Sequence, residues 1–244
     1  MAYYFIIAAI WFLSLWPLWL LYPFSDFVYF LVYHVFGYRK KVVFENLKNA
    51  FPEKSAKEII AIAKKFYRYH LCDLVIETTK IRHISKKNLL KRISIKNNEV
   101  LDKYREANKS VIAAIGHCGN WEWMAMYLSL TSDFDVYAIV KPFSDGKFDT
   151  YYDLKVRSRF TSGRLIPFKM SLRSMVRNKS KRTMNLFATD QSPAKNEIEY
   201  CTTFLNQNTA VYLGTEKIAK ALDMAVLFFY VQRKRRGYYE VEII

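Results

Sequence analysis

The first 38 residues contain no lysine or arginine, a single acid (Asp26) and 31 apolar residues. All 38 lysines and arginines of the 244-residue chain therefore lie in residues 39–244, against 21 acids, which gives this part a net charge of +17. An apolar segment of this length without a basic residue is buried in a core or held in a membrane. The chain is predicted to combine a membrane anchor or pair of interfacial helices, residues 1–38, with a basic body, residues 39–244.

The first apolar run, residues 3–22, is interrupted only by Ser14 and Pro17. A helix of 20 residues is about 30 Å long, the thickness of the hydrocarbon core of a bilayer, so the run predicts a membrane-spanning helix. It lacks the basic start and the small-residue cleavage site of a signal peptide, and we expect it to be retained. The second run, residues 24–38, is predicted to lie in the interface or on the body. The alternative is a buried helical hairpin. The basic cluster at residues 39–41 favours a body on the cytoplasmic side.

The body has the pattern of an α/β domain. Ser55 and Glu58 form a capping-box signature ahead of a long amphipathic helix that is predicted to end near Arg82. Short apolar runs then alternate with helical patterns, which predicts a mostly parallel sheet flanked by helices. The predicted strands are Val111–Gly116, Val136–Val140, Leu165–Pro167, Met184–Thr189 and Ala225–Val231, with Tyr238–Ile244 as an edge strand, and the predicted helices are Asn98–Ala107, Asp145–Thr161 and Gly214–Leu222.

Several classes of function are disfavoured by what the sequence contains. The three cysteines are widely spaced and odd in number, which favours a reducing compartment over a disulfide framework or a zinc site. The four histidines form no metal-binding motif, and no helix-turn-helix, zinc-finger or RNA-binding signature is present. We therefore expect neither a bound metal nor a nucleic-acid partner.

The stretch HCGNWEW, directly after the first strong strand, carries the best candidate for chemistry. His117 lies on a strand-to-helix turn, Gly119 permits that turn to be tight, and Glu122 lies in the first turn of the next helix. A carboxylate bonded to one imidazole nitrogen leaves the other free to accept a proton, so Glu122 is predicted to orient His117 as a general base. The alternative is a structural histidine with Glu122 as a favourable charge at a helix N-terminus.

The rest of the sequence limits the reaction that such a base could assist. There is no G-x-S-x-G motif, and Cys118 is predicted to be a packing residue because neighbouring residues at a strand end point to opposite faces. Without a nucleophile or metal of its own, a histidine–glutamate pair is suited to activating a substrate hydroxyl for acyl transfer. Trp121 is expected either to line a pocket or to pack in the core, with the core favoured.

The HCGNWE stretch resembles the H-x4-D/E motif of the glycerolipid acyltransferase superfamily, in the form found in the lipid A late (lauroyl/myristoyl) acyltransferases. Further stretches resemble the same family: RKKVVFENLKNAFPEKSAKE from Arg39, RSRFTSGRLIP from Arg157, FATDQSP from Phe187 and TTFLNQNTA from Thr202. The chain departs from the family at Phe204–Asn206 and at Ser192, which bears on the acceptor more than on the reaction. The family also implies a chain that continues past Ile244.

The resemblance implies that His117, oriented by Glu122, deprotonates a hydroxyl of a lipid acceptor, which then attacks the thioester of an acyl carrier protein. It further implies Arg159, with Arg157 second, as the cation at the thioester oxygen. Asp190 and Gln191 are implied to orient Arg159 or the acceptor. Asn120 is carried over as a further substrate-binding candidate because it lies inside the motif.

The expected protein is therefore an O-acyltransferase of lipid A biosynthesis at the inner membrane, with its body in the cytoplasm. Its partners are acyl carrier protein, which supplies the acyl donor so that no cofactor is needed, and an anionic membrane with its lipid acceptor. An acceptor that is another glycolipid, an aminolipid or a lysophospholipid stays open. So does a non-catalytic basic scaffold at the membrane.

Overall fold

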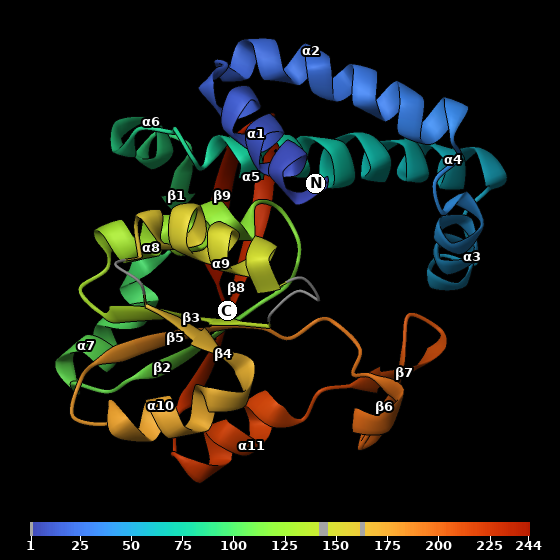
Figure 1. Cartoon of the computed structure of the whole chain (residues 1–244). Helices are drawn as coiled ribbons and strands as arrows, with labels where there is room; N and C mark the ends of the chain where they lie inside the picture. The colour runs from blue at the N-terminus through green and yellow to red at the C-terminus, as the bar shows by residue number, and fades with distance from the viewer. Residues whose placement is uncertain (1, 142–145, 162–163) are drawn as a thin grey trace.

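The computed structural model describes residues 2–141, 146–161 and 164–244. Seven strands form one sheet in the order β1-β9-β8-β2-β5-β3-β4, and every neighbouring pair is parallel except β8 with β9 (Figure 1). The predicted α/β fold with a mostly parallel sheet is confirmed. The strands are β1 (Ile93–Ile95), β2 (Val111–Ile115), β3 (Asp135–Val140), β4 (Leu165–Pro167), β5 (Thr183–Ala188), β8 (Ala225–Arg235) and β9 (Tyr238–Ile243).

The sequence predicted the last strand at the edge of the sheet, but the strand lies inside the sheet. β9 pairs with β8 on one side, and on its other side β1 runs parallel to it, with Ile95 opposite Val241. The alternation of Tyr238–Ile243 is that of a strand whose two faces differ in burial, and this pattern does not reveal a second neighbour. β1 was not predicted, because its three residues are too few to show a period.

Helices cover both faces of the sheet. α8 (Trp121–Thr131) and α9 (Gly146–Lys155) lie on one face, while α10 (Ser171–Arg177) and α11 (Gly214–Ala221) lie on the other (Figure 1). All five residues of β2 are buried, as a central parallel strand requires. The shorter helices are α6 (Lys86–Leu90), α7 (Asp102–Glu106), η3 (Asn98–Leu101), η4 (Arg157–Arg159), η5 (Phe168–Met170) and η6 (Lys195–Glu197).

The long helix before the sheet forms as predicted. It begins at the capping box, where the Ser55 side chain accepts from the Glu58 amide and the Glu58 carboxylate accepts from the Ser55 amide. It runs through α4 (Ala56–Lys65), a π-helical segment η2 (Phe66–Asp73) and α5 (Leu74–Lys80). A separate helix, α3 (Lys40–Ala50), precedes it.

The apolar run at residues 3–22 does not form one spanning helix. The chain folds into α1 (Ala2–Leu15) and α2 (Leu18–Tyr29), which continues as the π-helical η1 (Phe30–Val35). The break falls at Pro17, which has extended backbone angles, lacks an amide proton and disfavours helix in the residue before it. Leu18–Val35 is the stretch that is long and apolar enough to cross a membrane by length and composition, and 22% of it is buried.

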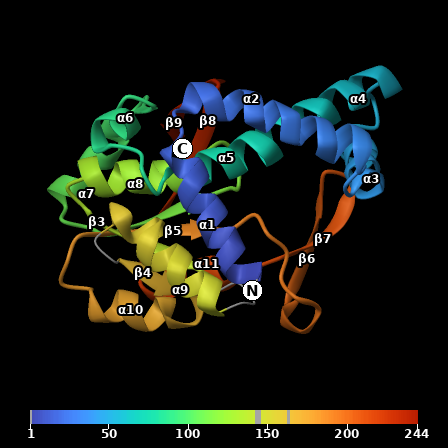
Figure 2. The same ribbon diagram turned by 45° about the horizontal axis from the view of Figure 1, so that its top comes forward.

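Polar contacts fasten these N-terminal helices to the body. The carboxylate of Asp26 on α2 accepts from Arg68 of η2 and from Arg236, which follows β8. Ser25 donates to the buried Asp73 at 2.7 Å, and Arg236 also binds Asp73. Both views show α2 lying along the outside of the α4–α5 helix (Figures 1 and 2).

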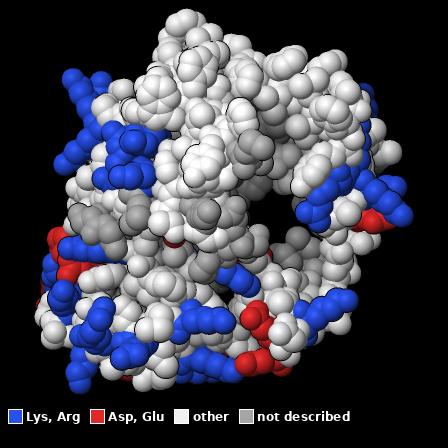
Figure 3. Space-filling view, viewed as in Figure 1, with Lys and Arg blue, Asp and Glu red and all other residues white. Residues whose placement is uncertain are grey.

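A two-stranded hairpin, β6 (Tyr200–Phe204) and β7 (Gln207–Val211), stands apart from the main sheet. Its tip contacts α3, where Asn206 donates to the carbonyl of Asn49 and the Asn49 amide donates to Gln207. The hairpin and α3 thus lie side by side (Figure 2), and the space-filling view shows an opening between them and the body (Figure 3).

Candidate active site

His117 and Asp190 occupy equivalent places after two neighbouring strands. β2 and β5 are parallel with Ile115 opposite Ala188, and each side chain follows two residues after its strand's last residue. The carboxyl edge of a parallel sheet is where loops gather functional groups. The register of two strands therefore brings together residues that are 73 positions apart.

The Asp190 carboxylate holds the His117 residue at two points. One oxygen, Oδ2, accepts from the backbone amide of His117 at 2.6 Å, and Oδ1 lies 2.5 Å from the ring Nδ1. Burial raises the pKa of Asp190, but the hydrogen bonds from the ring and amide of His117 outweigh burial and hold that pKa below its usual range. An ionised carboxylate only accepts, so it fixes the Nδ1–H tautomer and leaves Nε2 free to accept a proton.

The other side of the imidazole contacts two residues of the same site. The side-chain amide of Gln191 lies 3.4 Å from Nε2, and the Trp121 ring packs edge-on against His117 with 4.6 Å between centroids. Trp121 was expected in the core, but it lines the cavity beside His117, and the fully buried tryptophan of the stretch is Trp123. Gln191 and Trp121 thus bound the space in front of the basic nitrogen.

The spacing predicted that Glu122 binds the His117 ring, but it does not. It lies in the first turn of α8, where it was expected, but its carboxylate accepts from Arg157 at 2.7 Å and 3.0 Å. Glu122 is 8% exposed, and Arg157 also pairs with Asp153. Burial lowers the pKa of Arg157, yet the carboxylate of Glu122 raises it by more, so the guanidinium stays charged. The carboxylate that binds His117 therefore belongs to Asp190, whereas the carboxylate of Glu122 binds Arg157.

A cavity of about 320 Å³ adjoins His117. A mostly apolar pocket with a few polar groups in its wall is the usual form of a ligand site. Its apolar walls come from both layers of the fold: Ile115, Ala125, Met126, Ala138, Leu165, Leu186 and Phe187. Its polar wall includes His117, Glu122, Arg157 and Gln191. The His117 ring therefore adjoins a space with mostly apolar walls.

The remaining candidates take other places. Arg157 lines this cavity but Arg159 does not; the Arg159 guanidinium donates to the carbonyl of Ile81 at 2.6 Å. Asp190 therefore orients His117 rather than Arg159. Asn120 is fully buried and caps α8, because its side-chain oxygen accepts from the Trp123 amide. This is a structural role, and it places Asn120 behind the site rather than in the cavity wall.

Two features of the turn hold His117 in position. Gly119 has a φ of +59°, and an added Cβ would lie 2.6 Å from Val231 Cγ1 and 2.8 Å from the Val231 carbonyl oxygen, so only glycine fits. The Asn120 amide donates to Glu77, a buried carboxylate that also accepts from Tyr239 and Tyr22. Cys118 is half-buried, and burial raises the pKa of its thiol, which fits the predicted packing role.

His70 is part of this neighbourhood, although no motif pointed to it. It lies on η2 and stacks on Phe66, and its pKa is lowered first by burial and then by the nearby His117. The charges of His117 and Asp190 both act on the pKa of His70, so the helix that precedes the sheet brings a second imidazole into the neighbourhood of this pair. Only the tertiary fold brings this residue to the site.

A family model of bacterial lipid A biosynthesis acyltransferases matches residues 1–244, the whole of the chain. No curated protein matches the chain. Among the described residues, no group of three or more histidine, cysteine, aspartate or glutamate side chains is placed to hold a metal ion.

Proposed function

Because the chain belongs to the bacterial lipid A biosynthesis acyltransferase family, and is therefore an acyltransferase, we propose that it transfers a fatty acyl chain from acyl carrier protein to a hydroxyl of a lipid A precursor. The observation that carries the proposal is His117, held by Asp190, beside an apolar cavity. A base next to a space for a hydrocarbon chain is what acyl transfer to a hydroxyl requires. Acyl-carrier protein is itself the donor, so the reaction needs no cofactor or metal.

The proposed step begins at the free ring nitrogen. Nε2 of His117 takes the proton of the acceptor hydroxyl as the hydroxyl oxygen bonds to the thioester carbon. The Asp190 carboxylate stabilises the imidazolium that forms. When the carbon–sulfur bond breaks, the imidazolium returns the proton to the departing thiolate, and the carrier leaves as a thiol. The products are an ester and a free carrier, and the histidine ends in its starting state.

The neighbouring side chains have supporting roles in this proposal. The Gln191 amide, 3.4 Å from Nε2, is placed to hold the acceptor hydroxyl beside the base. Glu122 acts as a positioning residue through Arg157, because their ion pair fixes one polar wall of the cavity. Charge that develops on the thioester oxygen needs fixed donors, and a cation of the cavity wall serves better than one outside it. Arg157 is therefore the better candidate for the cation at the thioester oxygen, whereas the sequence favoured Arg159.

The cavity is the proposed site of the acyl chain. Two of its small residues, Ala125 and Ala138, lie on opposite layers, one on α8 and one on β3. Met126 and Leu186 are buried below them, so the walls are closed by large side chains. A chain bound there would keep its thioester near His117.

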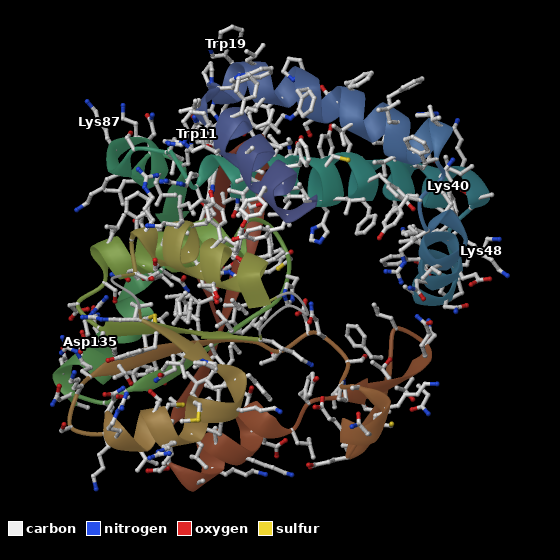
Figure 4. The ribbon with its side chains drawn as sticks, viewed as in Figure 1. Trp11, Trp19, Lys40, Lys48, Lys87 and Asp135 are labelled. Atoms are coloured by element: carbon white, nitrogen blue, oxygen red, sulfur yellow. The ribbon has the colours of Figure 1, made fainter. Side chains whose placement is uncertain are left out.

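We also propose that the protein is bound to the inner membrane with its body in the cytoplasm. The N-terminal helices expose large apolar side chains, including Phe5 at 75% and Trp19 at 73%, and Trp19 lies on the outer side of these helices (Figure 4). The 14 residues of α1 are too few to span a bilayer, and the ion pairs of Asp26 hold α2 along the body. These contacts favour helices that lie in the interface over helices that cross the membrane.

The proposal is tested by lipid mass spectrometry of cells that express the wild-type chain or His117→Ala at matched levels, in a strain lacking the native gene. We expect an acyl group on lipid A that is present with the wild type and missing with His117→Ala. A change confined to another glycolipid, an aminolipid or a lysophospholipid would keep acyl transfer and replace the acceptor. Identical lipids in the two strains would overturn the proposal and favour a non-catalytic scaffold.

A further inference from the structure

Basic side chains gather where the end of α1 meets the end of α5. The His83 ring Nδ1 lies 2.6 Å from the Ser14 hydroxyl, and the Lys80 ammonium donates to the Ser14 carbonyl at 2.7 Å. Arg159, from η4, donates to the carbonyl of Ile81 in the same turn. We define the cationic cluster by these residues and the arginine between them: Lys80, Arg82, His83 and Arg159.

The cationic cluster has no neutralising partner within the described parts of the chain. Its members contact backbone carbonyls, a serine and aromatic rings, and none of them forms an ion pair there. By contrast, Arg68 and Arg236 both form ion pairs with Asp26. The Nε of Arg82 is buried and has no hydrogen-bond partner. This part of the molecule therefore holds positive charge that the fold leaves uncompensated.

The electrostatics agree with this geometry. Burial lowers the pKa of Lys80, and the charge of Arg159 lowers it further. The pKa of Arg159 is lowered by burial and then by Arg82, and that of His83 by burial and then by Arg82. Cations that repel one another at a half-buried position are stabilised by an anion that contacts several of them.

The position of the cationic cluster indicates where the anion comes from. His83 packs edge-on against Trp11, a residue of α1 that is 48% exposed, and exposed tryptophans favour the level of the lipid headgroups. The space-filling view shows lysine and arginine side chains at α6, to the left of the apolar surface of the N-terminal helices (Figure 3). The cluster thus lies at the depth of headgroups if these helices rest in the interface.

We propose that the cationic cluster binds the phosphate group of a lipid headgroup, with a preference for a phosphate monoester. Guanidinium forks and an ammonium group match several oxygens of one phosphate, and a monoester offers more charge and more free oxygens than a diester. This inference rests on the proposed membrane contact and does not depend on acyl transfer. The site lies at the break between α1 and α2, outside the cavity that adjoins His117.

The test measures sedimentation of the full-length protein with vesicles of three compositions: phosphatidylcholine alone, or with an equal fraction of phosphatidic acid or phosphatidylglycerol. We expect Arg82→Gln to weaken binding to phosphatidic acid by about tenfold relative to phosphatidylglycerol, as for the loss of one charge-assisted contact. Lys87→Gln is the matched control, because Lys87 is exposed on α6 on the same side of the molecule and carries the same charge (Figure 4). It should weaken binding to both anionic lipids equally.

Three outcomes have distinct meanings. If Arg82→Gln and Lys87→Gln lose the preference for phosphatidic acid to a similar extent, the proposed site is wrong and the basic surface as a whole attracts the membrane. Arg159→Gln, at an exposed position on another element, repeats the test if Arg82→Gln melts below the wild type. Inorganic phosphate that abolishes the preference at low concentration would show a site for free phosphate rather than for a headgroup. If the wild type binds no vesicles, the proposed membrane contact itself fails.

Discussion

Nδ1 of His117 lies 2.5 Å from Oδ1 of Asp190, across the ends of two neighbouring parallel strands. The second carboxylate oxygen accepts from the His117 amide, so ring and backbone are fixed together. This leaves Nε2 as the unprotonated ring nitrogen beside the apolar cavity, where the Gln191 amide donates to it at 3.4 Å. The orientation of the base thus depends on a residue of β5's loop, whereas Glu122 belongs to a separate ion pair.

Asp190→Asn should lower kcat for acyl transfer by on the order of 10²–10⁴-fold, because an amide can donate to Nδ1 and stabilise the wrong tautomer. Initial rates with saturating donor and acceptor measure this. Asp135→Asn is the control, since Asp135 pairs with Arg164 at the opposite end of the strands (Figure 4). Equal rates for the two variants would contradict the assigned role of Asp190.

Glu122→Gln should destabilise the fold by about 3 kcal/mol, because it leaves the buried Arg157 guanidinium without its main partner. Chemical unfolding in detergent measures the free energy. Changing both residues, Glu122→Gln with Arg157→Met, should recover most of the loss. The exposed pair of Glu216 and Lys220 gives the comparison, and Glu216→Gln should have little effect. A double variant no more stable than the single one would contradict the assignment of this loss to the uncompensated charge of Arg157.

Gly119→Ala should destabilise the protein by at least about 1–2 kcal/mol, the cost of a left-handed backbone for a residue with a Cβ. The clash with Val231 adds to this cost and displaces the loop that carries His117, so activity should fall more than the melting temperature suggests. Gly146→Ala is the matched control, since nothing lies within 4 Å of its added Cβ. Normal activity in Gly119→Ala would show that the turn does not position the base.

The stabilising effect of Asp190 should depend on pH. Its folded pKa is lowered, so its contribution is complete above the unfolded pKa of about 3.9 and is lost as the pH falls through the folded value. The difference in unfolding free energy between wild type and Asp190→Asn should therefore be largest near neutral pH and shrink in acid. Unfolding curves at a series of pH values measure it. A difference that grows as the pH falls would have the wrong sign for a carboxylate stabilised in its charged form.

Ala138→Leu should shift the donor preference toward shorter acyl chains, because the larger side chain occupies part of the cavity. Competition between acyl carrier proteins that bear chains of different length measures the preference. Val226→Leu, on an exposed position of β8, adds one methylene group outside the cavity and is the control. An unchanged preference in Ala138→Leu would place the acyl chain elsewhere.

The central strands were predictable because their burial is continuous. A run such as Val111–Ile115, apolar at every position, has few alternatives to a central parallel strand. The hairpin of β6 and β7 lacks this signal, because β6 is exposed along its whole length and shows no alternation of burial. One continuous helix over residues 3–22 was a wrong prediction, because Pro17 has no amide proton and ends a helix inside the apolar run.

The site was predictable in part. His117 could be chosen from its place after a strand, and Asp190 from its place after another. Their contact could not be predicted, because it depends on β2 and β5 being neighbours in register, and the local sequence does not determine the strand order. The closeness of Glu122 and His117 in the chain predicted a contact between them, whereas in the fold the Glu122 carboxylate binds Arg157. His70 reaches the site through packing alone.

The most direct test of the account is acyl transfer by the purified, membrane-reconstituted protein, with acyl-carrier protein as donor and a lipid A precursor as acceptor. The ester product is measured by mass spectrometry for the wild type, His117→Ala and Asp135→Asn. We expect ester from the wild type and from Asp135→Asn, and a loss on the order of 10²-fold or more for His117→Ala. Full transfer by His117→Ala would contradict it.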